Sequence, residues 1–348
     1  MGNLLEYSGI VTKIRGMEAK LLTPEQFTEI ANLESVPEIV EYLKKNTAYA
    51  GILETLEADQ IHRGNIEKVL AQSLYHDYTK IYRFCGQKQR RFMKLIVKNY
   101  EIDLINYCLR IVINHYRQPF DLNYKRAFFD RYSQISIEKL IMSRTTDELV
   151  ENLKGTEYYA PLKRLKDSQN VTLYDYNLTL DLYFYTSTWR EQKKILKKAD
   201  LELFMRDRGS KIDLLNLQWI YRAKKYYNMK PADIYLMLIP IHYKLSTDLV
   251  KELVEASGLE EFEAAVAKTT YSRHYNFHQN LTIEQMYADC LHHLYTVDRR
   301  RDPYSVAAIN TYLFLKEEEI KKLTTAMECV RYQLTPGETL AYVGGKTQ

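Results

Sequence analysis

This sequence has few of the residues that interrupt helices. Among its 348 residues there are only 12 glycines and 8 prolines. Both residues break helices and gather in the turns of β-rich folds. Their scarcity disfavours a turn-rich β fold and predicts an all-α fold. The 46% hydrophobic content also argues against a disordered chain.

Long apolar runs are missing as well. The longest nearly uncharged run, Ile234–Ile241, is far below the roughly 20 residues that a membrane-spanning helix needs. The first residues contain neither a basic leader nor an apolar segment, so we expect no signal peptide. None of the four cysteines is in C-x-x-C spacing, which predicts reduced thiols in a cytoplasmic protein.

Neither sign of charge dominates. Forty-nine basic residues stand against 45 acidic ones, for a net charge of +4. Proteins that bind nucleic acid usually concentrate positive charge, so this balance argues against such a partner. Tyrosine, in contrast, is abundant at 30 residues. Its rings either pack long helices together or form an extended surface for a protein partner.

Recognisable catalytic motifs are missing too. The sequence has no P-loop, no Gly-x-Gly-x-x-Gly and no Gly-x-Ser-x-Gly. His274 and His278 have the helical spacing that can bind zinc, but the glutamate of the metalloprotease motif is not between them. Cys290, His292 and His293 would diverge on a helix. We expect no cofactor and no metal, and an enzyme site around His274 and His278 is kept as an alternative.

What the chain does have is an internal repeat. The pentapeptide Ile-Asp-Leu-x-Asn occurs at Ile102–Asn106 and Ile212–Asn216, 110 residues apart (212 − 102). A Thr-x-Tyr tripeptide recurs at a similar period, at Thr47–Tyr49, Thr156–Tyr158 and Thr269–Tyr271. Helix-start patterns precede it at Ser35–Glu38, Thr145–Glu148 and Ser257–Glu260. The sequence therefore predicts three copies of a helical unit of about 110 residues.

The predicted units cover residues 1–119, 120–230 and 231–348, with the third shortened. The residues around both joints are not rich in glycine or serine, so we expect docked units rather than flexibly linked ones. A second helix is predicted in each copy, at Ile66–Arg83, Tyr176–Leu196 and Ile283–Tyr295.

Polar residues recur within the repeat and are candidate structural positions. They are Asp103 and Asn106 in the first copy, Asp213 and Asn216 in the second, and Asn310 in a degraded third copy. The simpler interpretation is that each Asp caps a helix start while the Asn bonds to a neighbouring helix or loop. The alternative is that these pairs face a shared central surface.

Two basic clusters are candidate contacts for a partner. Lys88, Arg90 and Arg91 form the first, and Arg299, Arg300 and Arg301 form the second. Both are predicted at helix ends or loops. They are either solvated helix-end charges or contacts with an acidic protein surface.

An ordered set of segments resembles the C subunit of the prokaryotic V-type (A-type) ATPases, which is similar to the d subunit of the eukaryotic vacuolar ATPase. Beside the repeated motifs, the set comprises Glu18–Pro24, Leu238–Pro240, Tyr304–Leu313 and Lys316–Ile320. The resemblance extends over roughly residues 5 to 345 and rests on the order of the segments, because no single motif is diagnostic.

The resemblance implies an all-α, funnel-shaped body of three units around a pseudo-threefold axis, with no catalytic activity. It implies a place in the central stalk, peripheral on the cytoplasmic face of the membrane rotor ring, where the protein receives a shaft made of the D and F subunits. There it would couple ATP hydrolysis or synthesis to ion transport. The alternative from the residues alone is a helical-repeat scaffold for peptides or RNA, although such repeats are usually shorter.

Overall fold

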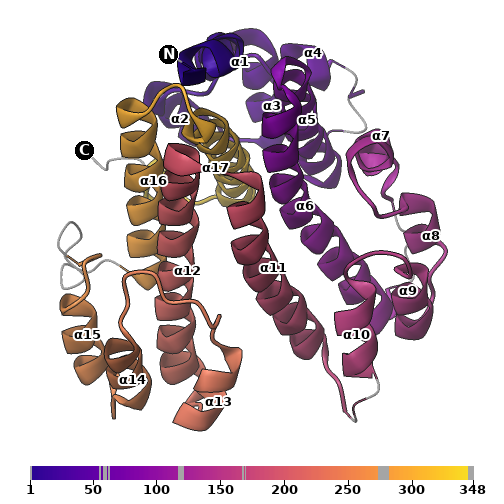
Figure 1. Cartoon of the computed structure of the whole chain (residues 1–348). Coiled ribbons are helices and arrows are strands. Elements are labelled where there is room, and N and C mark those ends of the chain that lie inside the picture. Colours follow the sequence, from indigo (N-terminus) through magenta and orange to yellow (C-terminus); the bar gives the residue numbers. More distant parts are fainter. Residues whose placement is uncertain are drawn as a thin grey trace. The chain divides into compact units, whose positions relative to one another are not determined.

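The computed structural model of the chain is built from helices (Figure 1). It describes residues 2–343 except 55, 58–60, 62, 117–120, 167, 169 and 273–281. These described residues form eighteen helices and no strand, so the all-α prediction is confirmed. None of the described helices is both long and apolar enough to cross a membrane. All four cysteines are buried, and none is in a disulfide.

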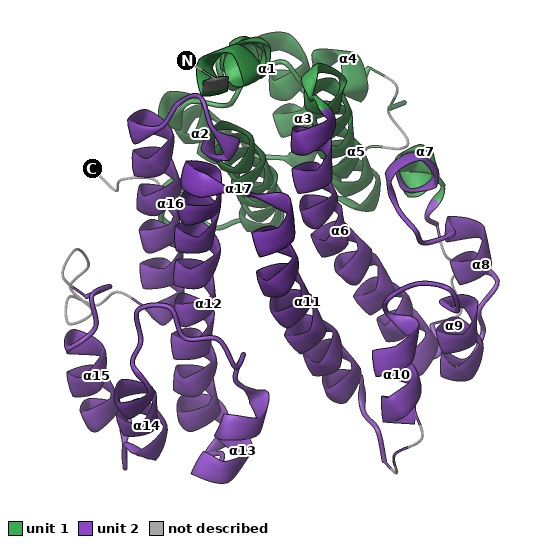
Figure 2. Ribbon diagram, viewed as in Figure 1, with its two compact units in different colours: residues 1–86, 123–128, 308–348 green, residues 87–122, 129–307 purple. Residues whose placement is uncertain are grey.

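Two compact units divide the chain (Figure 2). Unit 1 combines residues 1–86, 123–128 and 308–348. Its helices are α1 (Gly2–Glu18), α2 (Pro24–Ala31), α3 (Val36–Asn46), α4 (Ala50–Leu53), α5 (Arg63–Phe84), most of α17 (Val306–Arg331) and α18 (Pro336–Val343). One apolar core joins both ends of the chain, since Ile39 and Leu70 are fully buried in the same cluster as Leu323.

Unit 2 comprises residues 87–122 and 129–307. Its frame consists of four long helices, α6 (Gln87–Ile113), α11 (Leu173–Ile195), α12 (Lys198–Tyr227) and α16 (Ile283–Arg301). Successive long helices run in opposite directions, with α11 packed on α6 and α12 packed on α16.

Short helices lie beside the lower halves of the long ones in Figure 1. They are α8 (Ile137–Ile141), α9 (Thr146–Asn152), α10 (Tyr159–Lys166), α13 (Pro231–Met237), α14 (Thr247–Glu255) and α15 (Leu259–Ala267). Helix α7 (Asn123–Tyr132) contributes its first residues to unit 1 and its last to unit 2. The division of the chain at 119 and 230 stays a prediction.

The three predicted second helices are confirmed as α5, α11 and α16. Two of the predicted caps are also present, because Ser35 and Thr145 accept hydrogen bonds from the amides of Glu38 and Glu148. The predicted cap at Ser257 is wrong by one residue. Gly258 is the N-cap of α15 and has no side chain to accept a bond.

The helix starts nevertheless share one hydrogen bond. A glutamate carboxylate accepts from the backbone amide four residues earlier, in the pairs Glu38–Glu34, Glu148–Arg144 and Glu261–Ser257. The negative charge of the carboxylate lies at the helix start, where the helix dipole is positive and the backbone amides have no partner within the helix. In the third copy this glutamate is Glu261 and not the predicted Glu260.

Candidate functional site

A buried carboxylate on α12 holds the α13–α15 segment. Asp213 is fully buried, and its oxygens accept bonds from the backbone amides of Tyr243, Lys244 and Leu245. The Tyr271 hydroxyl also donates to it, at 2.8 Å. Burial raises the pKa of Asp213, while the three amides and the hydroxyl act in the opposite direction. The charge is therefore stabilised by donors rather than by a cation.

The same arrangement occurs on α6. Glu101 is buried and accepts from the Tyr158 hydroxyl, from the Ser133 hydroxyl and from the Gln134 amide at 3.0 Å. The tyrosine follows its carboxylate by 57 residues here and by 58 residues in the α12 pair. Burial and the adjacent carboxylate raise the pKa of Tyr158 well above its usual value, so this tyrosine stays a donor.

A third pair lies in unit 1, between the two ends of the chain. The Tyr49 hydroxyl donates to Glu319 on α17 at 2.6 Å, although the two residues are 270 positions apart. Glu319 also accepts from the backbone amide of Leu22. The Thr47–Tyr49 tripeptide is thus used like the other two, but its carboxylate comes from the opposite end of the sequence.

Three corrections to the predicted repeat positions follow. Asp103 is exposed, and the counterpart of Asp213 on α6 is Glu101, two residues earlier. The predicted caps at Asp103 and Asp213 are wrong, because both residues lie well inside α6 and α12. Asn310 lies nine residues before Glu319 (319 − 310), so it is not the third-copy counterpart of the predicted asparagines.

The two asparagines of the signature also differ. Asn216 is fully buried, donates to the carbonyl of Ile239 and accepts from the amide of the same residue. The prediction that it bonds to a neighbouring loop is confirmed, and neither Asp213 nor Asn216 is on a surface. Asn106 has a buried Oδ1 atom without a hydrogen-bond partner among the described residues.

The structure places the first basic cluster at the start of α6. Arg90 and Arg91 are exposed, while Lys88 reaches the buried Asp200 of α12, 3.5 Å away. Asp200 also accepts from the amide of Val306, the first residue of α17. The prediction that this cluster lies at a helix end is confirmed.

The second basic cluster occupies the last turn of α16. Arg300 and Arg301 are exposed and Arg299 is half-buried. The preceding residue, Asp298, is buried and paired with Arg206 of α12, whose Nε atom is 2.8 Å from Oδ2. This pair fixes the end of α16 against α12, close to the start of α6.

Sequence reasoning missed four lysines at the same end of unit 2. They are exposed and flank the corner between α11 and α12, at Lys193, Lys194, Lys197 and Lys198. The run Lys-Lys-Ile-Leu-Lys-Lys was readable, but only the antiparallel packing shows that it joins the other two clusters. We call these four lysines, together with Lys88, Arg90, Arg91 and Arg299–Arg301, the basic end of unit 2.

No group of three potential metal ligands was found in the described part of the chain. His274 and His278 lie outside the described residues. Cys290 is buried, and burial raises its pKa to about 12, which suits a core thiol rather than a metal ligand or nucleophile.

Comparison with known proteins gives one consistent answer. The sequence profile of the ATP synthase (C/AC39) subunit family matches residues 10–342. The C subunit of the A-type ATP synthase of Thermococcus kodakarensis is 25% identical over 346 residues, covering 97% of this chain and 90% of that protein. The same protein of Pyrococcus horikoshii is 23% identical with the same coverage. That of Methanosarcina mazei is 26% identical over 265 residues, covering 76% and 71%.

The family match covers nearly all of a helical chain that repeats its tyrosine–carboxylate pairs. The chain therefore belongs to the ATP synthase (C/AC39) subunit family, and it is a component of a rotary ATPase complex rather than an enzyme in its own right.

Proposed function

We propose that this protein is the central-stalk adaptor of a V-type ATPase. It connects a shaft of the D and F subunits to the membrane rotor ring, and it thereby couples ATP hydrolysis or synthesis to ion transport. The family match over residues 10–342 carries the proposal. The protein is peripheral on the cytoplasmic face of the membrane and acts through protein contacts, without nucleic acid or a cofactor.

An adaptor between two rotating parts must transmit torque without deforming. The long helices of unit 2 suit this role, because a helix of 30 residues such as α12 is a rod of about 45 Å. The short helices are tied to these rods by buried carboxylates that accept several hydrogen bonds each. Charge-assisted bonds of this kind are about twice as strong as neutral ones.

The basic end of unit 2 is the proposed contact with an acidic surface of the shaft or ring. Its ten cationic side chains come from α6, α11, α12 and α16, so the contact depends on the fold of the unit. The nearest buried acids, Asp200 and Asp298, are already paired with Lys88 and Arg206. Arg91, Arg300 and Arg301 are exposed, as are the four lysines of the α11–α12 corner, so a partner of opposite charge can reach them. Binding through these cations weakens with salt.

The first test mixes the purified chain with the D–F pair and, separately, with the detergent-solubilised rotor ring. Size-exclusion chromatography then reports stable complexes by co-elution. We expect both complexes to form. Binding to neither partner would refute the adaptor role.

A charge-reversal series then tests the contact surface. We expect Arg90→Glu with Arg91→Glu, or Arg300→Glu with Arg301→Glu, to weaken binding of one partner at least about tenfold at low salt. Lys163→Glu with Arg164→Glu is the matched control, because these exposed residues lie on α10 at the opposite end of unit 2. Equal binding by all three variants would show that the basic end is not part of the interface. The adaptor role itself would then be judged by the co-elution result alone.

A further inference from the structure

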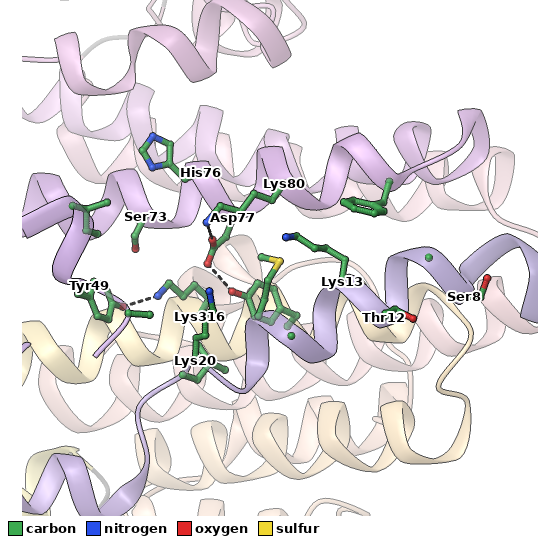
Figure 3. Close-up of a pocket in the computed structure, with 18 residues that line it drawn as sticks. Ser8, Thr12, Lys13, Lys20, Tyr49, Ser73, His76, Asp77, Lys80 and Lys316 are labelled. Atoms are coloured by element: carbon green, nitrogen blue, oxygen red, sulfur yellow. Dashed lines mark hydrogen bonds and ion pairs between the residues drawn. The ribbon is translucent and has the colours of Figure 1, made fainter. Parts of the chain in front are cut away.

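Unit 1 contains a cavity whose lining is rich in lysine (Figure 3). Its volume is about 710 Å³, within the range of sites that hold small molecules. The walls come from α1, α4, α5 and α17. The cationic side chains of the lining are Lys13, Lys20, Lys80 and Lys316, and Asp77 is the single carboxylate among the described residues that line it.

Two of these lysines are already neutralised. Lys316 is buried, and its Nζ atom lies 2.8 Å from Glu319 and 2.7 Å from the Tyr49 hydroxyl. Lys80 lies 3.0 Å from Asp77, which also accepts from the Tyr312 hydroxyl. These pairs form a fixed polar floor for the cavity.

The other two lysines are left without an acid. Neither Lys13 nor Lys20 is in an ion pair with any described residue. Lys13 is on α1 and Lys20 is in the turn that follows it, and both side chains line the cavity. Figure 3 shows the ammonium groups of both directed toward the space around Asp77 and Lys316. The cavity therefore has a surplus of positive charge.

Small residues on the same face of α1 keep the space open. Gly9, before Lys13 in the sequence, and Gly16, between Lys13 and Lys20, both line the cavity. A Cβ atom added at Gly16 would meet nothing within 4 Å, and one at Gly9 would only touch Phe84 at 3.9 Å. The ring of Phe84 also lines the cavity and is 52% exposed, which offers an apolar face beside the cations.

We propose that this cavity binds a phosphate-bearing small anion of nucleotide size. Lys13 and Lys20 would contact its phosphate oxygens as point charges, above the floor that Lys316 and Lys80 form. A single orthophosphate is far smaller than the cavity, so the ligand carries either a chain of phosphates or a further group against Phe84. This inference is independent of the adaptor role, because it uses only residues of unit 1.

Isothermal titration of the full chain at low salt tests the proposal with three probes. These are ATP, inorganic tripolyphosphate and adenosine. We expect saturable binding of ATP and no binding of adenosine. Tripolyphosphate shows which part of ATP is recognised. An affinity for tripolyphosphate within about tenfold of that for ATP would mean that the phosphates alone are recognised. A weaker affinity would mean that the nucleoside also contributes to binding.

Two variants test the location. Lys13→Gln with Lys20→Gln removes the surplus charge, and Gly16→Leu fills the space while leaving every charge in place. We expect each to weaken ATP binding at least about tenfold. The control is Lys45→Gln with Lys321→Gln, which removes two exposed charges of unit 1 outside the cavity. Circular dichroism melting verifies that each variant is folded.

The proposal would be overturned if neither ATP nor tripolyphosphate bound at about 1 mM, a concentration that detects even weak sites. It would also be overturned if the folded cavity variants bound as well as the control. Equal loss in the control and in the lysine pair would indicate attraction by net charge rather than a site.

Discussion

The Tyr271 hydroxyl lies 2.8 Å from Oδ2 of Asp213, and both residues are buried. Burial and the neighbouring Asp213 charge raise the pKa of Tyr271 well above its usual value, which favours the protonated phenol as the donor. The bond joins the turn after α15 to the middle of α12.

Replacing the acceptor of this bond is expected to cost more than replacing its donor. Tyr271→Phe leaves Asp213 with three amide donors and should lower the free energy of unfolding by about 1.5–3 kcal/mol. Asp213→Asn turns an amide NH₂ toward those donors and should cost at least about 3 kcal/mol. Urea unfolding followed by tryptophan fluorescence measures both, because Trp189 and Trp219 are the protein's two tryptophans and both are in unit 2.

Asp103→Asn is the matched control for that pair. Asp103 occupies the same place in the sequence signature but is exposed. A loss of stability from Asp103→Asn as large as that from Asp213→Asn would contradict the assignment of Glu101 as the α6 counterpart.

The two asparagines of the signature should respond in opposite ways to leucine. Asn216→Leu leaves the buried amide of Ile239 without its acceptor, while the Ile239 carbonyl keeps only the bond from the Ile241 amide, so the change should cost about 1–3 kcal/mol. Asn106→Leu replaces a side chain whose buried oxygen already has no partner among the described residues, so its cost should be below about 0.5 kcal/mol, or it should stabilise. The same fluorescence experiment compares them, and similar losses in both would count against the bonds to Ile239.

Stability should depend on pH through Asp181 of α11. Burial, and secondly the charge of Asp103, raise the pKa of Asp181 to about 6 from its ordinary 3.8. A raised folded-state pKa favours the folded form most when the acid is protonated, below about pH 4, and this contribution is lost as the pH rises through about 6. We expect Asp181→Asn to stabilise the protein by about 1–3 kcal/mol at pH 8 and hardly at all at pH 4.

Unfolding curves at both pH values measure the difference. Asp103→Asn should give a smaller gain in the same direction, since it removes only the secondary cause of the shift. A gain from Asp181→Asn that is the same at pH 4 and pH 8 would show that ionisation is not the reason.

Gly209 allows the ring of Tyr243 to lie against α12. A Cβ atom at this position would be 2.5 Å from Cγ of Tyr243, too close for any real contact. Gly209→Ala should therefore destabilise unit 2 by about 1–3 kcal/mol, although alanine favours a helix more than glycine does. Thermal melting by circular dichroism measures the loss.

Two comparisons make the Gly209 test specific. Gly16→Ala, at an open position of α1, should instead stabilise by about 0.5–1 kcal/mol. In a Tyr243→Gly background, which also removes the Tyr243 Cβ atom that would lie 2.8 Å away, the cost of Gly209→Ala should largely disappear. A cost that persists there would place the clash elsewhere.

The sequence predicted the helical class and the extent of three helices, because those depend on local periodicity and on the scarcity of glycine and proline. It also identified Thr-x-Tyr as a recurring element, and each tyrosine proved to be a buried donor. Its capping patterns were correct where a hydroxyl side chain was present at the cap position, at Ser35 and Thr145.

The carboxylates could not be predicted in the same way. No flanking residue is common to Glu101, Asp213 and Glu319. They are equivalent because each lies on the face of a long helix that meets a distant tyrosine. Asp103 has the same neighbours in sequence as Asp213 but lies two residues after Glu101. Two residues are more than half a helical turn, so the Asp103 side chain points to solvent. The basic end of unit 2 likewise depends on antiparallel packing that brings α6, α11 and α16 together.

The bond from Tyr49 to Glu319 has a consequence for biosynthesis. Residues 1–86 leave the ribosome first, but their core includes Leu323 and Met327, which are made after the 221 residues of positions 87–307 (307 − 87 + 1). At about 5–20 residues per second, the first segment waits roughly 10–45 s for its partner. Unit 2 can therefore complete its contacts while the start of the chain still exposes apolar surface, and the segment that is translated earliest is the last to reach its native state.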